Sequence, residues 1–282
     1  MWLLLTIVAT FCFAFARLLQ KSIVSNEKTD PMAYSVYFQL LVASILLPVA
    51  LVNGWEFPPI ETVWFGLLLT ALFYCLANIF SYNALKKIPV SDFTIIIATI
   101  PIWTMLTSMV VLKESTNPMK LFGILLTVIG IMVAFYTKKK FIANKYHLFA
   151  LLAAICLGFA FTNDAFMLKT FKATTYSFVY FFWPGALLGL IYYKRLKGIA
   201  VIVRNGWVKS VIPSILFATA ALAVNNAYKI GGEISQIATI TQANIILVIL
   251  FSFLFLHEKT RLPQKLIGGT IVFLGIILVQ MK

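Results

Sequence analysis

Two aspartates inside long apolar segments are the residues of this sequence with the clearest chemistry to offer. Asp164 follows Asn163 within one apolar run, and Asp92 follows Ser91 near the start of another. A charged side chain in a helix that crosses a bilayer costs about 2.5–3.5 kcal/mol at the helix centre, so it usually faces a cavity or a partner. Because a carboxyl group in apolar surroundings can bind a proton reversibly, Asp164 is the first candidate proton carrier and Asp92 the second. The alternatives are a pair between Asp164 and Lys169 or lipid headgroups, and a plain N-terminal helix position for Asp92.

Arg17 is the one arginine within an apolar run. It is a candidate partner for an anionic group of a substrate. Alternatively, its long side chain extends to the nearer membrane surface, about two helical turns away. Both interpretations remain open from the sequence.

Neutral polar residues gather in three of the apolar segments. Amide groups that faced lipid would lack hydrogen-bond partners, so they should point into the protein. Together with nearby aromatic residues they predict an amphipathic cavity, although hydrogen bonds between helices are the simpler explanation. The candidate cavity residues are Asn78, Asn83, Trp103, Asn163, Asp164, Tyr180, Trp183, Asn225, Asn226, Gln242 and Asn244.

The composition indicates whether the chain lies in water or in a lipid bilayer. Hydrophobic residues make up 61% of the 282 residues and charged residues 11%, with a mean hydropathy of +0.96. An ordinary soluble domain has about 25% charged residues. The chain is therefore expected in a bilayer, and a soluble enzyme, a disulfide scaffold and a disordered protein are excluded.

The net charge of +14 does not indicate a nucleic-acid partner, because lysines and arginines fall in short tracts between apolar runs. There they meet lipid headgroups or fix the topology. Cys12, Cys75 and Cys156 are isolated within apolar runs and form no metal-ligand pattern. No catalytic or phosphate-binding motif occurs, so we expect no enzyme activity, metal or cofactor.

Apolar runs of about 20 residues, the length that spans a bilayer as helix, are separated by charged and turn residues. They predict ten transmembrane helices, at residues 1–24, 32–52, 60–84, 90–112, 119–137, 145–168, 174–193, 206–228, 234–256 and 264–281.

The second half of the chain repeats the first at a nearly constant offset. The repeated residues include Asn83-Ala84 with Asn226-Ala227, and Pro118, Lys120, Gly123 and Gly130 with Pro263, Lys265, Gly268 and Gly275. We therefore predict two repeats of five helices, over residues 1–140 and 141–282. An odd number of helices inverts the second repeat in the membrane, which is an arrangement that recurs in secondary transporters. Arg17 and Asp164 lie toward the C-terminal ends of equivalent helices in inverted repeats, so they should sit near opposite membrane surfaces and a direct pair between them is not expected.

The segment from Tyr82 to Tyr136, YNALKKIPVSDFTIIIATIPIWTMLTSMVVLKESTNPMKLFGILLTVIGIMVAFY, resembles the EamA-type members of the drug/metabolite transporter superfamily. The shared features are a mid-helix proline (Pro101), a glutamate that closes the helix (Glu114) and a following glycine-bearing helix. The second half repeats them with Glu258 and Gly268 but lacks the proline. The resemblance implies membrane transport of a metabolite without specifying which one.

Gly123 and Gly130, like Gly268 and Gly275, are seven residues apart and share one helix face. Small residues allow close helix approach, so the fifth and tenth helices should pack tightly or form a homodimer. The distribution of lysine and arginine favours termini outside the cell, whereas the family resemblance favours termini inside.

We therefore predict a secondary transporter in a prokaryotic inner or plasma membrane. It would move a small amphipathic metabolite, such as an amino acid, outward by alternating access. A channel or structural membrane protein and, less favoured, a lipid-modifying enzyme are the alternatives.

Overall fold

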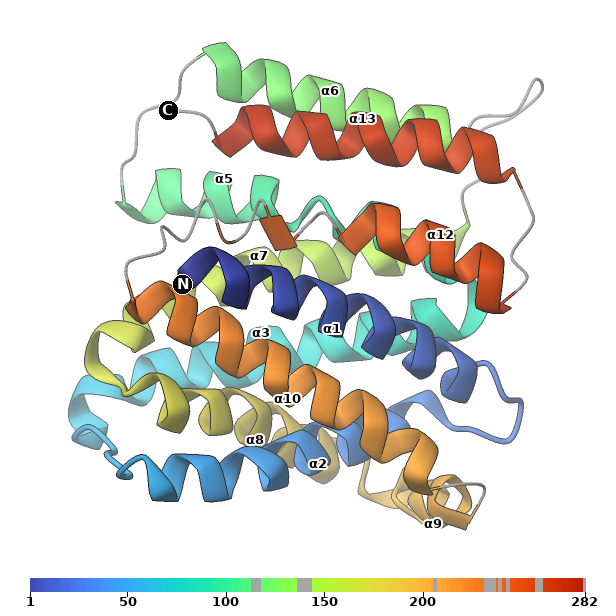
Figure 1. Ribbon diagram of the computed structural model, residues 1–282. Coiled ribbons are helices and arrows are strands. Elements are labelled where there is room, and N and C mark those ends of the chain that lie inside the picture. Colours follow the sequence, from blue (N-terminus) through green and yellow to red (C-terminus); the bar gives the residue numbers. More distant parts are fainter. Residues whose placement is uncertain are drawn as a thin grey trace.

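The computed structural model describes residues 1–112, 118–135, 144–204, 207–230, 237, 240–241, 244–256 and 261–280, which form helices joined by short turns (Figure 1). None of these residues lies in a strand, so the predicted all-helical class is confirmed for them. In chain order the helices are α1 (Trp2–Val24), α2 (Pro31–Val52), α3 (Ile60–Lys87), α4 (Val90–Ile97), α5 (Ile100–Leu112), α6 (Pro118–Phe135), α7 (Lys145–Thr170), α8 (Ala173–Ile191), the 3-10 turn η1 (Tyr193–Arg195), α9 (Lys197–Arg204), α10 (Trp207–Lys229), α12 (Asn244–Leu256) and α13 (Leu262–Gln280).

Within the part of the chain that the structure describes, seven helical segments are long and apolar enough to cross a membrane. They are Trp2–Val24, Pro31–Val52, Ile60–Lys87, Val90–Thr107, Lys145–Thr170, Ala173–Ile191 and Trp207–Lys229. Three shorter apolar helices, Leu121–Ala134, Asn244–Leu256 and Leu262–Leu278, overlap the other three predicted spans. A total of ten crossings therefore stays a prediction.

Local capping fixes where two of these helices begin. The carboxylate of Asp30 accepts hydrogen bonds from the amides of Met32 and Ala33, and Pro31 occupies the first turn of α2. At the start of α7, the Asn144 side chain accepts from the amides of Tyr146 and His147. Side-chain acceptors of this kind satisfy amides that have no partner within the helix.

The fourth predicted span is broken, because α4 ends at Ile97 and α5 begins at Ile100. Pro101 has no amide hydrogen to donate to the carbonyl of Ile97, and its ring crowds that carbonyl. Thr99 occupies the turn, where its hydroxyl donates to the Ile96 carbonyl at 2.7 Å and accepts from Nε1 of Trp103 at 3.2 Å. The sequence places the proline within this span, and the structure adds that the helix ends before it.

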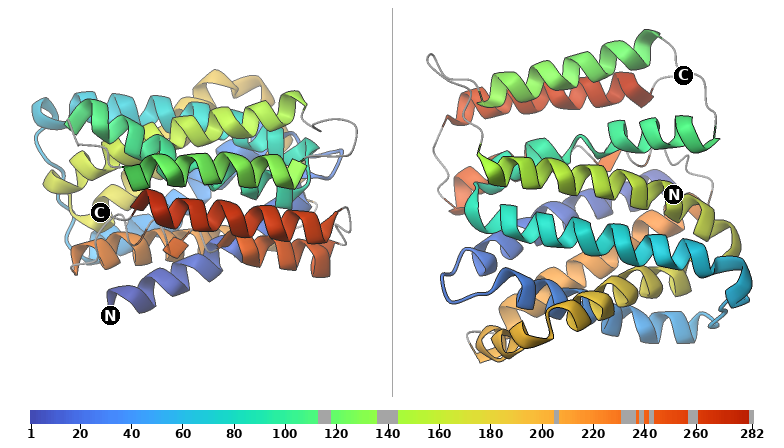
Figure 2. Two further views of the ribbon diagram at one scale, coloured as in Figure 1. Left: turned by 90° about the horizontal axis from the view of Figure 1, so that it is seen from above. Right: turned by 180° about the vertical axis from the view of Figure 1, so that it is seen from behind.

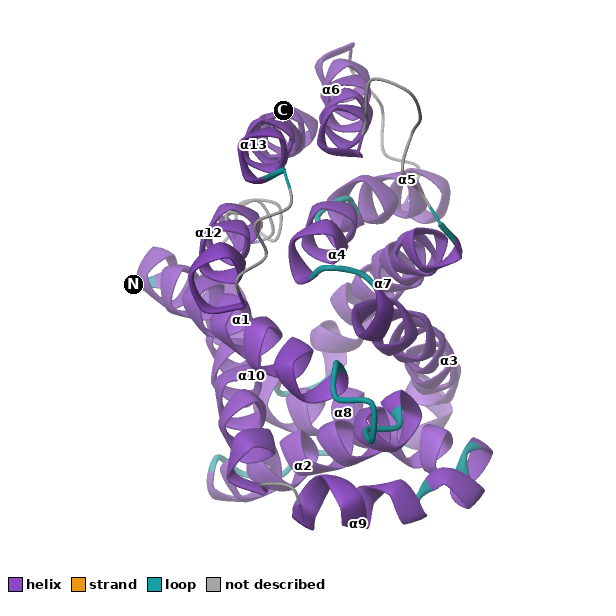
Figure 3. Cartoon of the chain, turned by 90° about the vertical axis from the view of Figure 1, so that its right-hand side faces the viewer, coloured by secondary structure: helices purple, strands orange, loops and turns teal. Residues whose placement is uncertain are grey.

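The major helix pairs each join an element of residues 1–140 to one of residues 141–282. Along the molecule, α1 packs on α10, α3 on α7, α2 on α8 and α6 on α13. Figure 3, seen nearly along the helix axes, has α1, α10 and α12 on one side and α3, α4, α5 and α7 on the other. The two sides are joined by α2 and α8 at one end of the bundle.

The α6–α13 pair forms its own layer at the edge of the bundle, and Figure 2 shows the two helices side by side from above. A Cβ atom on Gly268 would lie 2.7 Å from the carbonyl oxygen of Gly130, and one on Gly275 would lie 2.7 Å from the amide nitrogen of Thr127. Only a hydrogen fits there, so the predicted glycine faces contact each other within one chain. A homodimer through these helices would use their outer faces and stays a prediction.

Residues between α8 and α10, expected only as a break rich in lysine and arginine, form η1 and α9. Ile202 is buried, whereas Arg204 is exposed. Arg195 Nη1 lies 3.4 Å from the Asp30 carboxylate at the start of α2. A short helix with one apolar and one basic face is typical of a segment that lies along a membrane surface.

Candidate functional site

A cavity of about 300 Å³ lies between the two sides of the bundle, lined from α1, α2, α3, α4, α5, α7, α8, α10 and α12. Its volume is at the lower end of the range for small-molecule sites. Much of the wall is aromatic, from Phe13, Phe38, Phe93, Phe161, Phe181 and Phe217. Its polar side chains are Arg17, Gln20, Gln39, Asn78, Ser81, Asp164, Asn225 and Asn244, together with tyrosine hydroxyls.

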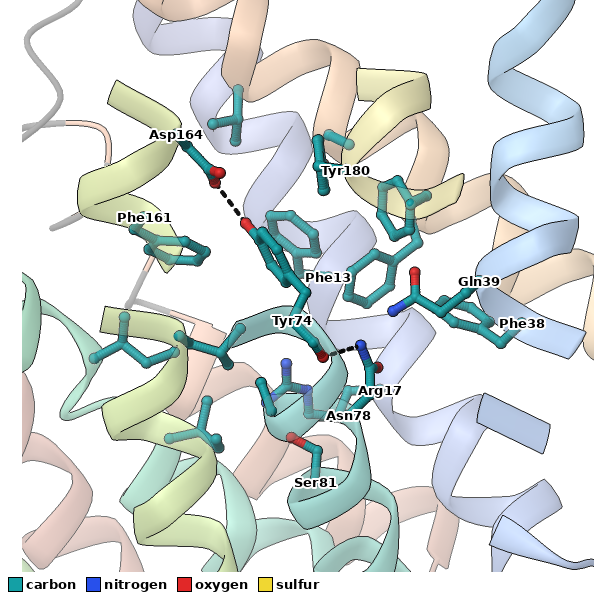
Figure 4. A pocket seen from close by; sticks show the side chains of 18 of the residues that line it. Phe13, Arg17, Phe38, Gln39, Tyr74, Asn78, Ser81, Phe161, Asp164 and Tyr180 are labelled. Atoms are coloured by element: carbon teal, nitrogen blue, oxygen red, sulfur yellow. Dashed lines mark hydrogen bonds between the residues drawn. The ribbon is translucent and has the colours of Figure 1, made fainter. Parts of the chain in front are cut away.

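Asp164 faces this cavity from α7, and Figure 4 shows its carboxylate hydrogen-bonded to Tyr74. Two tyrosines hold this carboxylate. The hydroxyl of Tyr74 on α3 donates to Oδ2 at 2.5 Å, and the hydroxyl of Tyr176 on α8 donates to Oδ1 at 2.6 Å. Lys169, the alternative partner considered from the sequence, instead lies 5.1 Å from the ring of Phe166. Hydroxyl donors to both oxygens stabilise a carboxylate that has little contact with water.

Asn163 does not belong to the cavity lining, but its hydrogen bonds lead to Tyr176, which binds Asp164. Its Nδ2 donates to the Gly66 carbonyl at 3.0 Å and to the Thr70 hydroxyl at 2.9 Å. The Thr70 hydroxyl lies 3.2 Å from the hydroxyl of Tyr176. A chain of hydrogen bonds therefore joins the backbone of α3 to the tyrosine that holds Asp164.

Arg17 also lines the cavity, which agrees better with the first of the two interpretations, a partner for a substrate, than with an extension to the membrane surface. Its guanidinium carbon lies 5.2 Å from the centre of the Phe93 ring, within reach of a cation–π interaction. Among the described residues no ion pair joins Arg17 to Asp164, although both line this one cavity. Two charged groups of opposite sign thus face one cavity without touching.

Four of the predicted neutral and aromatic residues line the cavity: Asn78, Tyr180, Asn225 and Asn244. The Tyr180 ring stacks on Tyr74, with ring centres 5.5 Å apart. Asn225 donates from Nδ2 to the hydroxyl of Ser177 at 2.6 Å, and Asn78 donates to the carbonyl of Tyr74 at 2.6 Å. Asn78 and Asn225 thus place amide groups at the wall of the cavity.

Four other candidates lie outside the cavity lining. The amides of Asn83 and Asn226 donate to their own helices, at the carbonyls of Ile79 and Leu222, and Asn226 is exposed. Trp183 is 41% exposed on the outer surface. Trp103 packs where α5 meets Gly158 of α7. Gln242, Glu114 and Glu258 lie outside the described residues.

Asp92 lies in the first turn of α4, away from the cavity lining, within a second buried cluster of charges. Its Oδ1 lies 2.6 Å from Nζ of Lys265 on α13, and its Oδ2 lies 3.5 Å from Nε2 of His147 on α7. Lys265 also donates to the Ser91 hydroxyl at 2.9 Å. This geometry makes Asp92 a link between helices, so it agrees better with the helix-start alternative than with proton transfer in the cavity.

Two cavity amides, Gln20 and Gln39, were missed by the sequence analysis. Gln20 donates to the hydroxyl of Tyr82 at 3.3 Å. Oε1 of Gln39 is buried without a hydrogen-bond partner among the described residues. Both are single amides in otherwise apolar helices, so the argument applied to the asparagines could have found them.

Seven apolar segments that can cross a membrane, packed around an internal cavity with charged groups, define an integral multi-pass membrane protein. A family model described as the EamA-like transporter family matches residues 1–136 and 144–281. The chain therefore belongs to this family of membrane transporters, within the drug/metabolite transporter superfamily, and the predicted resemblance is confirmed.

A solved structure titled "Crystal structure of protein" has a similar fold, with a TM-score of 0.60 at 15% sequence identity. The alignment covers 97% of this chain and 98% of that chain. At this identity the likeness concerns the fold alone. No curated protein sequence matches the chain.

Proposed function

We propose that the protein is a secondary transporter that moves a small amphipathic solute by alternating access through the cavity. The observation that carries this proposal is the contact of Tyr74, on α3, with Asp164, on α7, inside the cavity. An alternating-access site lies at the interface of two repeats that exchange roles. A group held by side chains of both halves is well placed to respond when they move.

The pattern of helix contacts supports two inverted five-helix repeats, over residues 1–140 and 141–282. If α1 corresponds to α7, α2 to α8, α3 to α10, α4 with α5 to α12, and α6 to α13, then exchanging the halves turns each major contact into another. The pair α1–α10 becomes α3–α7, α1–α12 becomes α5–α7, and α2–α10 becomes α3–α8, all of which are observed. The pairs α2–α8, α4–α12 and α6–α13 map onto themselves. Two separate matches to one family model support the same division.

Proton coupling at Asp164 follows from its hydrogen bonds. As a carboxylate, Asp164 accepts from both Tyr74 and Tyr176. When it takes up a proton, one of its oxygens becomes a donor, so one tyrosine has to turn its own donation elsewhere. Protonation would then change a contact between α7 and either α3 or α8. Of the cavity-lining residues that the structure describes, Asp164 alone carries a carboxyl group.

The solute is a metabolite with a polar group and an apolar body, such as an amino acid or a related compound. The aromatic side chains of the cavity wall offer contact to an apolar body. The amides and charged groups of the cavity lining can bind the polar groups of the solute. Export from a prokaryotic cell across its inner membrane is the direction and place that we propose. Lipids would cover exposed apolar residues such as Trp64, Leu125 and Leu254.

Counterflow in proteoliposomes tests this function against the channel and the enzyme. Vesicles that hold about 10 mM of an unlabelled amino-acid mixture, roughly tenfold above the upper end of typical KM values, are diluted into trace labelled amino acids, tested one at a time. A carrier gives transient accumulation of label inside the vesicles, because outward solute drives inward exchange. A channel gives only equilibration, and an enzyme gives a labelled product. Absence of counterflow with every amino acid and with unrelated small metabolites would contradict the proposal.

A further inference from the structure

Arg17 is the charged group in the cavity whose partner is missing. Its guanidinium contacts the ring of Phe93 at 5.2 Å, and among the described residues no carboxylate or hydrogen-bond acceptor lies in contact with it. Buried charges in proteins are normally paired, because the loss of hydration has to be offset. A guanidinium that faces an internal cavity without an anion therefore points to an anion that arrives with the solute.

Gln39 gives an independent indication from a different helix. Gln39 is 5% exposed, yet its Oε1 has no hydrogen-bond partner within the part of the chain that the structure describes. Figure 4 shows its amide group directed at the cavity. Buried amides are rarely left unsatisfied. Rotation of the terminal amide presents either its nitrogen as a donor or its oxygen as an acceptor. Two unsatisfied groups, from α1 and α2, thus face the same cavity.

We propose that Arg17 and Gln39 form a carboxylate-binding subsite, and that the transported solute is a monocarboxylate with an apolar body. This inference rests on the proposed transport function and names the chemical class of its solute. The planar guanidinium fork matches the two oxygens of a carboxylate, and the Gln39 amide nitrogen supplies a further donor. A single positive charge fits a monoanion better than a phosphate dianion.

The carboxylate of Asp164, the negative charge in the cavity, does not occupy the guanidinium of Arg17. Both oxygens of Asp164 already accept from tyrosine hydroxyls, and Asp164 forms no ion pair with Arg17. The apolar body of the solute would lie against the ring cluster next to Gln39. There, Phe217 packs edge-on against Phe38, with ring centres 5.3 Å apart, and against Phe181, at 6.2 Å. The cavity volume of about 300 Å³ is enough for a body of at least one aromatic ring, because a cavity of about 150 Å³ already holds benzene.

Binding to the full chain in detergent tests the subsite without requiring transport. The probes share one body and differ in charge: 3-phenylpropionate, its methyl ester, L-phenylalanine and phenethylamine, each measured by isothermal titration calorimetry. We expect 3-phenylpropionate or L-phenylalanine to bind wild type at least 10-fold more tightly than the ester and the amine. Preference for phenylalanine over phenylpropionate would narrow the class to zwitterions and would support the subsite equally.

Substitutions then connect this preference to Arg17. R17Q should weaken binding of the carboxylate probe at least 10-fold and leave the ester within twofold, and R17K, which keeps the charge but loses the fork, should weaken it about 3- to 10-fold. R204Q, at an exposed arginine of α9, is the matched control and should have no effect. If R17Q does not fold, the inference is tested by R17K and by the comparison of 3-phenylpropionate with its methyl ester on wild type. Equal binding of acid and ester, no binding of either carboxylate, or carboxylate binding within twofold of wild type in R17Q would overturn the inference.

The same probes in proteoliposomes separate this inference from the transport proposal. Carboxylate binding that depends on Arg17, without any exchange, would support the subsite and contradict transport. Exchange of 3-phenylpropionate or L-phenylalanine that is unchanged in R17Q would support transport and overturn the subsite.

Discussion

The hydroxyl of Tyr74 lies 2.5 Å from Oδ2 of Asp164, and this hydrogen bond joins α3 to α7 inside the cavity. The other oxygen of the same carboxylate accepts from Tyr176 of α8 at 2.6 Å. One carboxyl group is therefore bound by helices from both halves of the chain. A movement of α3 away from α7 would break the bond of Tyr74, whereas the bond of Tyr176 lies within the second half of the chain.

Removal of one of these donors should lower stability. Tyr74→Phe keeps the ring stacked on Tyr180 but leaves Oδ2 of Asp164 without its donor. Because hydrogen bonds to charged groups contribute about 1.5–3 kcal/mol, we expect a loss of this size in the free energy of unfolding. Denaturation in mixed micelles measures it, with Tyr193→Phe at an exposed tyrosine as the control. Equal stability of the two variants would mean that the Tyr74 bond does not hold Asp164.

Lys265 and Asp92 form a buried ion pair that attaches α13 to α4, with Nζ and Oδ1 2.6 Å apart. Lys265→Met should destabilise the protein by about 3–5 kcal/mol, because it leaves a buried carboxylate without its cation. Lys172→Met, which breaks the exposed pair with Glu56, should cost less than about 1 kcal/mol. The same unfolding assay compares them. The double variant Lys265→Met with Asp92→Asn should recover part of the loss, and a double variant no more stable than the single one would contradict this assignment.

The close contact of α6 with α13 should not tolerate a methyl group. In Gly268→Ala the new Cβ would lie 2.7 Å from the Gly130 carbonyl oxygen, and overpacking of this kind costs about 1–3 kcal/mol. In Gly189→Ala the nearest atom is Cγ1 of Val36 at 3.6 Å, an ordinary contact. Alanine is intrinsically better than glycine within a helix by about 0.5–1 kcal/mol, so this control should be neutral or stabilised. Thermal unfolding measures both variants, and we expect a lower Tm for Gly268→Ala and an equal or higher Tm for Gly189→Ala.

The adjacent residues Asn225 and Asn226 should differ in their effect on solute affinity. Asn225 lines the cavity and donates to Ser177, whereas Asn226 is exposed and bonds to its own helix. Asn225→Ala should weaken solute binding about fivefold, the equivalent of one hydrogen bond of about 1 kcal/mol, and Asn226→Ala should change it less than twofold. Concentration dependence of counterflow measures both. A larger effect for Asn226→Ala would contradict the placement of the cavity.

The helical class and the approximate helix bounds were predictable, because they depend on local composition and backbone chemistry. The proline within the fourth predicted span was noted, but the end of α4 at Ile97 was not predicted. Asp164, Arg17, Asn78, Tyr180, Asn225 and Asn244 were found because charges and amides inside apolar segments have few other places to go. The sequence could not show which polar residues of a helix line the cavity and which bond to their own helix. Asn83 and Asn226 are equivalent in the two halves, yet both bond to their own backbones.

Pairings between distant segments were beyond sequence reasoning. The bond of Lys265 to Asp92 depends on how α13 packs against α4, and no periodicity specifies this. Lys265 attracted attention only as a repeated residue, although a lysine within an apolar helix needs a partner as much as an aspartate does. Gln39 was overlooked in the same way, because it is one amide in a helix that otherwise appears lipid-facing.

Proton-driven accumulation in Asp164→Asn proteoliposomes tests the central claim most directly. With a solute that shows counterflow, an imposed proton gradient should drive wild type, and the control Glu61→Gln at an exposed position of α3, to accumulate it above equilibrium. Asparagine keeps the shape of the side chain but cannot bind and release the proton. We therefore expect Asp164→Asn to retain counterflow and to lose accumulation. If Asp164→Asn accumulates the solute as wild type does, Asp164 does not carry the proton, and transport down the solute's own gradient replaces proton coupling as the account of this protein.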